Sequence, residues 1–229
     1  MNISSAPRED AAADAANPEP TEDALAADHI LGPKLAALLR LKLDASVTHL
    51  YTRGIRRHIR AALQAGATRE EVLTVLKLST VIGIHALAVG MPILNQELDY
   101  AQTPAQPQPP FCSTPVCDTL RRDRQFNPDW DAIYDAAPDW LENFLASALE
   151  FWRDGILPPL WIELLCIAGD SALTHMYSPG TRRHIHAALS LGATREQILA
   201  VLDIVGHQGQ EAVETAVHIL DDVWAKERP

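Results

Sequence analysis

The chain is poor in cysteine, with three in 229 residues. An odd and sparse set argues against a disulfide scaffold. Cys112 and Cys117 lie in a proline-rich stretch without a nearby histidine, which favours a linker over a metal or redox pair. Cys166 stands alone in an apolar segment. None of the three therefore predicts thiol chemistry.

Basic charge and long apolar runs are also scarce. Lys and Arg number 19 against 30 Asp and Glu, a net charge of −11, so nucleic acid is not an expected partner. The sequence has no run of about 18 apolar residues, so a membrane span is not expected. The first residues lack the basic-then-apolar order of a signal peptide. We therefore expect no membrane partner and a cytoplasmic location. Flavin, nicotinamide and pyridoxal motifs are not evident, so no cofactor is expected.

An internal repeat is the strongest pattern in the sequence. Residues 44–76 match residues 170–202 at an offset of 126, with 20 of 33 positions identical by direct count. Each repeat reads as three helices, and two further helices are predicted near residues 130–134 and 140–152. Thr68 with Glu71, and Thr194 with Gln197, have the spacing of capping boxes that begin the third helices. The sequence therefore predicts an all-α fold.

Composition divides the chain into four parts. Residues 1–27 are predicted to be a disordered acidic tail. Residues 28–98 form the first repeat, and residues 99–125 form a proline-rich linker. Residues 126–229 form the second repeat with its preceding helices. The third helix is expected to end near Gly90, before Pro92, in the first repeat.

Two histidines are predicted to point inward. His58 and His184 share the apolar face of the second helix of their repeats, whereas His186 lies on the opposite side. On the preceding helix, polar residues form one stripe, and a carboxylate–imidazole pair there would suit proton transfer at carbon. The alternative is a set of core residues that bond neighbouring helix ends. The stripe comprises Glu163, Asp170, Thr174 and Tyr177 in the second repeat, and Asp44, Thr48 and Tyr51 in the first, where Ala37 replaces Glu163.

Paired arginines precede each inward histidine. Arg182 and Arg183 would hold a substrate carboxylate, because guanidinium binds carboxylates bidentately, or they would form a solvated face. His175 lies off the stripe and would join the pocket, cap a helix or face a subunit. His85 is replaced by Glu211 in the second repeat, a divergence of function or of packing.

The inward histidine followed by Ala-Ala-Leu and a Gly-Ala-Thr-capped helix is similar to the carboxymuconolactone decarboxylase family. That family includes the alkylhydroperoxidase-D-like proteins. The resemblance implies an all-α homo-oligomer with active sites near subunit contacts, and for a fused pair a trimer that imitates a hexamer. Peroxidase-type members carry Cys-x-x-Cys-x-x-x-His, but here the cysteine positions are Tyr177 and Gly180, or Tyr51 and Gly54. A disulfide-based peroxidase is therefore not expected.

The leading hypothesis is a cofactor-independent lyase of aromatic-compound catabolism, acting on a small carboxylated lactone or related ring-cleavage product. His184 would be the general acid/base, assisted by Glu163 and Asp170. His58 with Asp44 would form a second, degenerate site. Substrate would be bound by Arg182, Arg183, Thr174, His175, Tyr177 and Tyr51.

Two other hypotheses remain open from the sequence. One is a non-catalytic protein that binds a small ligand or serves in assembly, which the missing cysteines permit. The other is a metal-dependent enzyme with His175, His184 and Glu163 as ligands.

Overall fold

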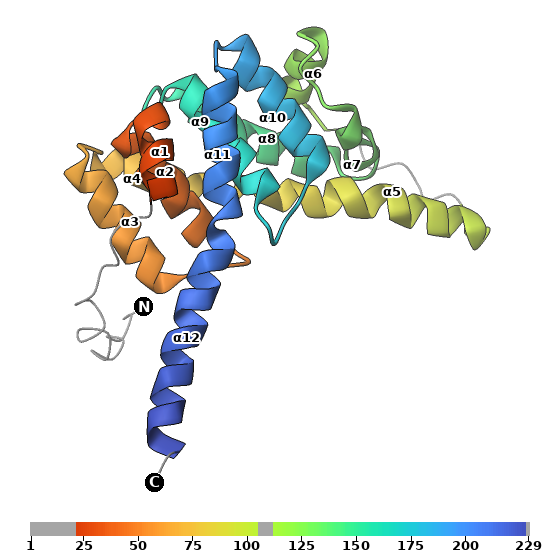
Figure 1. Ribbon diagram of the computed structural model, residues 1–229. Helices are drawn as coiled ribbons and strands as arrows, with labels where there is room; N and C mark the ends of the chain where they lie inside the picture. Colours follow the sequence, from red (N-terminus) through yellow and green to blue (C-terminus); the bar gives the residue numbers. More distant parts are fainter. Residues whose placement is uncertain (1–21, 105–111, 228–229) are drawn as a thin grey trace, which may run out of the picture.

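The computed structural model describes residues 22–104 and 112–227, and every regular element in these ranges is helical (Figure 1). Prolines occupy the first turn of five of the α-helices, α2, α6, α8, α9 and α10, where their missing N–H costs no hydrogen bond. The all-α prediction is confirmed. The α-helices are α1 (Glu22–Leu31), α2 (Pro33–Asp44), α3 (Thr52–Gln64), α4 (Arg69–Leu78), α5 (Ile84–Tyr100), α6 (Pro115–Arg122), α7 (Asp131–Ala136), α8 (Pro138–Arg153), α9 (Pro159–Ser171), α10 (Ser178–Ser190), α11 (Arg195–Gly206) and α12 (Gln208–Glu227).

The helices of the two repeats recur at the offset seen in the sequence. α2 begins at Pro33 and α9 at Pro159, which is 159 − 33 = 126 residues later. Both predicted capping boxes are present, with Thr68 and Thr194 accepting a hydrogen bond from the backbone N–H three residues on. The same local rules therefore begin the same helices in both repeats.

The two repeats share one core, in which α2 and α9 pack against each other. Residues 162–170 of α9 are all buried, so this helix is enclosed on every side. Thr48 and Thr174, which are equivalent in the two repeats, are joined by a 2.7 Å hydrogen bond between their hydroxyls. A contact between equivalent residues is what an approximate two-fold axis produces. The two repeats are thus related by an approximate two-fold axis that passes near this contact.

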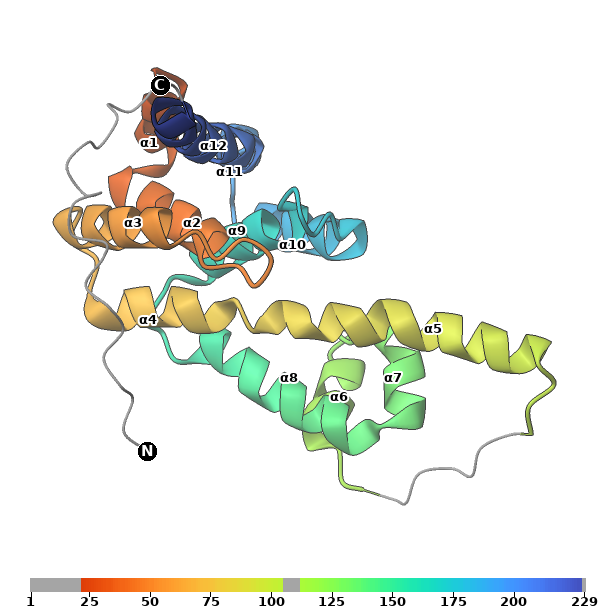
Figure 2. The ribbon, with the colours of Figure 1, turned by 90° about the horizontal axis from the view of Figure 1, so that it is seen from below.

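A second, smaller core lies between α5 and the helices that separate the repeats. Ile84 and Ala88 of α5 pack with Trp130, Ile133 and the buried face of α8. Figure 2 shows α5 as a long helix with α6–α8 on one side and α9 and α10 on the other. Residues of α5, α8 and the second repeat line a common cavity.

Three boundaries differ from the sequence expectation. The third helix of the first repeat is broken by a 3₁₀ turn, Val81–Gly83, and α5 then continues past Gly90 to Tyr100 with Pro92 on an exposed face. The expected linker of residues 99–125 contains α6. Pro115 lies in the first turn of this helix, a position that proline favours. α1 takes residues 22–27 from the expected tail, whose residues 1–21 lie outside the described range.

The stretch from Arg69 to Tyr100 is long and apolar enough, by length and composition alone, to cross a membrane. The sequence reading found no such span. However, 44% of its apolar window is buried inside the protein, and the 3₁₀ turn interrupts it. These features are typical of a helix that packs within a fold.

Gly54 is required because Asp44 packs directly over it. A Cβ atom at this position would lie 2.5 Å from Asp44 Oδ2 and 2.6 Å from Tyr51 Cδ1. We expect Gly54→Ala to lower the free energy of unfolding by about 1–3 kcal/mol, measured by denaturant titration.

Gly90→Ala is the matched control, because Gly90 lies inside α5 with open space around its Cβ position. This substitution should raise stability by about 0.5–1 kcal/mol. Equal stability of the two variants would contradict the close packing of Asp44 on Gly54.

Candidate functional site

The candidate site is a cavity of about 1350 Å³ between the second repeat, α5 and the intervening helices. The second repeat contributes Glu163 and Asp170 from α9 and three consecutive residues, Arg182, Arg183 and His184, from α10. α8 contributes Trp152, and the turn before α7 contributes Trp130. The predicted catalytic residues of the second repeat therefore line one cavity.

His184 and Glu163 form a buried pair on the cavity wall. His184 Nδ1 lies 2.6 Å from Glu163 Oε2, and the indole N–H of Trp152 donates to Glu163 Oε1 at 2.7 Å. Arg183 donates to His184 Nε2 at 3.0 Å. These partners place the imidazole proton on Nδ1 and the lone pair on Nε2. Burial lowers the pKa of His184, and the Glu163 carboxylate opposes this shift.

Asp170 is a buried carboxylate whose Oδ2 atom has no hydrogen-bond partner within the described residues. Its Oδ2 lies 3.8 Å from His184 Nε2, and its Oδ1 lies 3.8 Å from His85 Nδ1. Burial raises the pKa of Asp170 to about 7, although Arg183 and Lys42 act in the opposite direction. Asp170 is therefore partly protonated near neutral pH.

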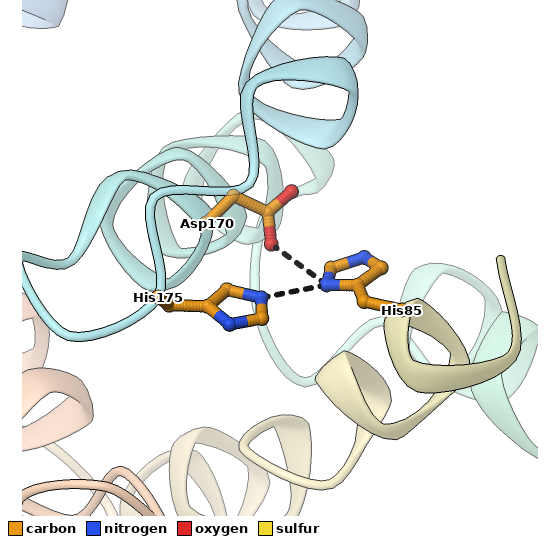
Figure 3. Close-up of side chains that lie close together, drawn as sticks. All are labelled: His85, Asp170 and His175. Carbon is orange, nitrogen blue, oxygen red and sulfur yellow. Dashed lines mark hydrogen bonds and ion pairs between the residues drawn. The ribbon is translucent and has the colours of Figure 1, made fainter. Parts of the chain in front are cut away.

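His85 reaches the second repeat from α5 and meets His175 there (Figure 3). Its Nδ1 lies 2.8 Å from His175 Nε2. The ring of Tyr177 stacks on His85 at 3.8 Å between centroids and holds its orientation. Burial lowers the pKa of His85 to about 3 and also lowers that of His175, so both imidazoles are neutral.

Lys42 is a site residue that sequence reasoning missed. It is buried in α2, its Nζ lies 3.5 Å from Ser79 Oγ, and burial lowers its pKa. Gly169 makes room for it, because a Cβ there would lie 3.2 Å from Lys42 Cε. The signal was present in the repeat comparison: Lys42 is a charged residue in an apolar helix where the second repeat has Ala168.

The first repeat has its own buried pair, outside the cavity lining. His58 Nδ1 lies 2.5 Å from Asp44 Oδ2. Tyr51 and Asp44 both pack against Gly54, so Tyr51 lies close to this pair. The two repeats therefore place their inward histidines alike but give them different partners.

The remaining predicted residues divide into those at the cavity and those elsewhere. Arg182 and Arg183 line the cavity, and the Arg183 guanidinium lies 5.4 Å from the centre of the Trp130 ring. Thr174 lies instead at the contact between the repeats, and Tyr177 packs on His85. The alternative metal set of His175, His184 and Glu163 is not brought together, because His175 meets His85 and Asp170.

A solved structure resembles this chain over most of its length. It is a crystal structure from Burkholderia xenovorans LB400, given the provisional name of a gamma-carboxymuconolactone decarboxylase subunit. The two share 33% sequence identity with a TM-score of 0.79, covering 87% of this chain and 81% of that chain. The chain belongs to the carboxymuconolactone decarboxylase family. No protein-family model and no curated protein matches it.

Cysteine chemistry has no support at this decarboxylase-family site. Cys166 lines the cavity, but it is buried, and burial raises the pKa of its thiol. Burial likewise raises the pKa of Cys117 to about 12. At neutral pH both thiols stay protonated and are poor nucleophiles.

We expect a thiol-specific reagent to modify the half-buried Cys112 first in the native protein. Cys117 and Cys166 should react on the timescale of unfolding, because both are buried and protonated. Ellman's reagent with mass mapping measures the order, and guanidinium-unfolded protein gives the total of three. Rapid modification of Cys166 in folded protein would contradict this assignment.

Proposed function

We propose that the protein is a lyase that decarboxylates a small carboxylated lactone or a related ring-cleavage product, by acid/base chemistry at His184. One observation carries the proposal. A buried, neutral imidazole is fixed by Glu163 on one side and opens through Nε2 to a cavity that also contains two arginines. Family membership supports the reaction class.

The arginines would bind the substrate. Arg182 and Arg183 face the cavity, and a guanidinium holds a carboxylate through two parallel hydrogen bonds. Arg183 is oriented by its contacts with Trp130 and with His184 Nε2. A bound carboxylate would draw Arg183 towards itself and leave Nε2 free to take a proton and deliver it to the reacting carbon.

Decarboxylation breaks a carbon–carbon bond, releases carbon dioxide and leaves an electron pair on the substrate. The substrate carbon must then take up a proton. Asp170, with a pKa of about 7, holds such a proton 3.8 Å from His184 Nε2, and the imidazole would pass it on. Glu163 would stabilise the imidazolium formed in transit.

The first repeat would serve the fold. His58 is paired with Asp44 directly, Ala37 stands where Glu163 would be, and neither partner lines the cavity. We therefore assign the reaction to the second repeat alone. The cytoplasmic location and the homo-oligomer that the resemblance implies stay predictions.

His184→Gln tests the assignment, because glutamine keeps polar contacts but cannot carry the proton. We expect kcat for carbon dioxide release from carboxylated lactones to fall by about 10²–10⁴-fold, with the fold retained by circular dichroism. His207→Gln is the matched control. His207 is a surface residue bonded to the Asp203 carbonyl, and its variant should keep full activity.

Wild-type turnover in His184→Gln would remove His184 from the reaction. A wild-type protein that binds carboxylated lactones without releasing carbon dioxide would contradict the lyase and favour the ligand-binding function.

A further inference from the structure

Three potential metal ligands converge beside the proposed reaction site. His85 Nδ1, His175 Nε2 and a carboxylate oxygen of Asp170 all lie within 4.8 Å of one another. They come from α5, from the turn after α9 and from α9 itself. Figure 3 shows His175 and one carboxylate oxygen of Asp170 both facing the same nitrogen of His85.

Asp170 is available because another residue has taken its usual partner. In the first repeat the equivalent Asp44 bonds the inward histidine directly, at 2.5 Å. In the second repeat Glu163 occupies Nδ1 of His184, and Asp170 remains 3.8 Å from that ring. Its Oδ2 is left buried without a hydrogen bond, although buried carboxylates are normally compensated. Arg183 and Lys42 lower the pKa of Asp170 but do not hydrogen-bond this oxygen, so Oδ2 can accept a further partner.

We propose that His85, His175 and Asp170 form a binding site for one first-row divalent cation, of the zinc or ferrous iron class. Two imidazoles and one carboxylate are the ligands that such ions prefer. Ligands at adjacent positions around these ions lie about 3 Å apart, given metal–ligand bonds of about 2.1 Å. The two nitrogens are 2.8 Å apart, and a small rotation of the carboxylate brings its oxygen in from 3.8 Å.

The imidazoles are prepared for this role. The hydrogen bond between His85 Nδ1 and His175 Nε2 needs one proton between two lone pairs, and a metal ion would replace that proton. Each imidazole then carries its proton on the nitrogen that faces away from the metal, so both rings remain neutral. Tyr177 stacks on His85 and fixes its plane, which reduces the cost of organising the site.

Lys42 is the competing cation for Asp170. It lies close enough to lower the pKa of Asp170, but its hydrogen bond is to Ser79. Burial lowers the pKa of Lys42, which favours the neutral amine and reduces its repulsion of a metal. The three ligands leave further coordination positions, and both His85 and Asp170 line the cavity. Water or a substrate oxygen would fill those positions.

The metal site shares Asp170 with the proposed proton relay but does not use the His184–Glu163 pair. A bound cation would hold Asp170 as a carboxylate, so it would compete with the proton that Asp170 carries, and it would leave His184 with Glu163 and Trp152. The test of the metal site therefore measures binding and not turnover.

Untagged, chelator-stripped protein should bind one Zn²⁺ per chain in isothermal titration calorimetry. Co²⁺ should give visible d–d bands typical of nitrogen and oxygen ligands. His85→Ala and His175→Ala should each weaken Zn²⁺ binding at least about 100-fold. Circular dichroism checks that each variant folds. Because the two substitutions lie in different elements, the test still works if one of the variants fails to fold.

His186→Ala is the control, because His186 is an exposed histidine of α10 at the same cavity. It should leave Zn²⁺ affinity unchanged. The absence of stoichiometric binding, equal binding by the wild type and both ligand variants, or an equal loss in His186→Ala would each overturn the site. Zn²⁺ binding without decarboxylation of any substrate would overturn the proposed function alone, and decarboxylation by a chain that binds no metal would overturn the metal site alone.

Discussion

A carboxylate buried between two helices must be compensated, and this constraint shapes both repeats. In each repeat an aspartate at the end of the first helix packs over a glycine of the second, at Asp44 on Gly54 and Asp170 on Gly180. The glycine is needed because a Cβ atom there would collide with the carboxylate. Neither repeat could therefore carry a larger residue at this position without moving the carboxylate.

The site arises where the repeats stopped being equivalent. At equivalent positions the second repeat has Glu163 where the first has Ala37. The first repeat has Lys42 and His85 where the second has Ala168 and Glu211. Glu163, Lys42 and His85 all line the cavity. The shared residues maintain the helices and their contacts. The residues that differ give one cavity a carboxylate–imidazole pair, an aspartate with one oxygen not hydrogen-bonded, and a second histidine. The proposed function therefore depends on the residues that differ between the two repeats.

Sequence reasoning reached the fold and part of the site. Helical spacing placed His58 and His184 on buried faces, and the capping boxes located α4 and α11, because these are local rules. The path of α5 across the second repeat was not predictable in the same way. It depends on a 3₁₀ turn and on packing against helices distant in sequence, and it brings His85 and His175, 90 residues apart, into contact. Thr174 was misplaced because its role is at the contact between repeats.

Glu163 bonds the inward histidine of the second repeat at the nitrogen that an aspartate bonds in the first. A crystal structure of Glu163→Ala, which places the first-repeat residue at that position, tests whether Glu163 keeps Asp170 from this bond. We expect Asp170 then to bond His184 Nδ1 directly, as Asp44 bonds His58 at 2.5 Å. An Asp170 carboxylate that remains apart from His184, still turned towards His85, would contradict it.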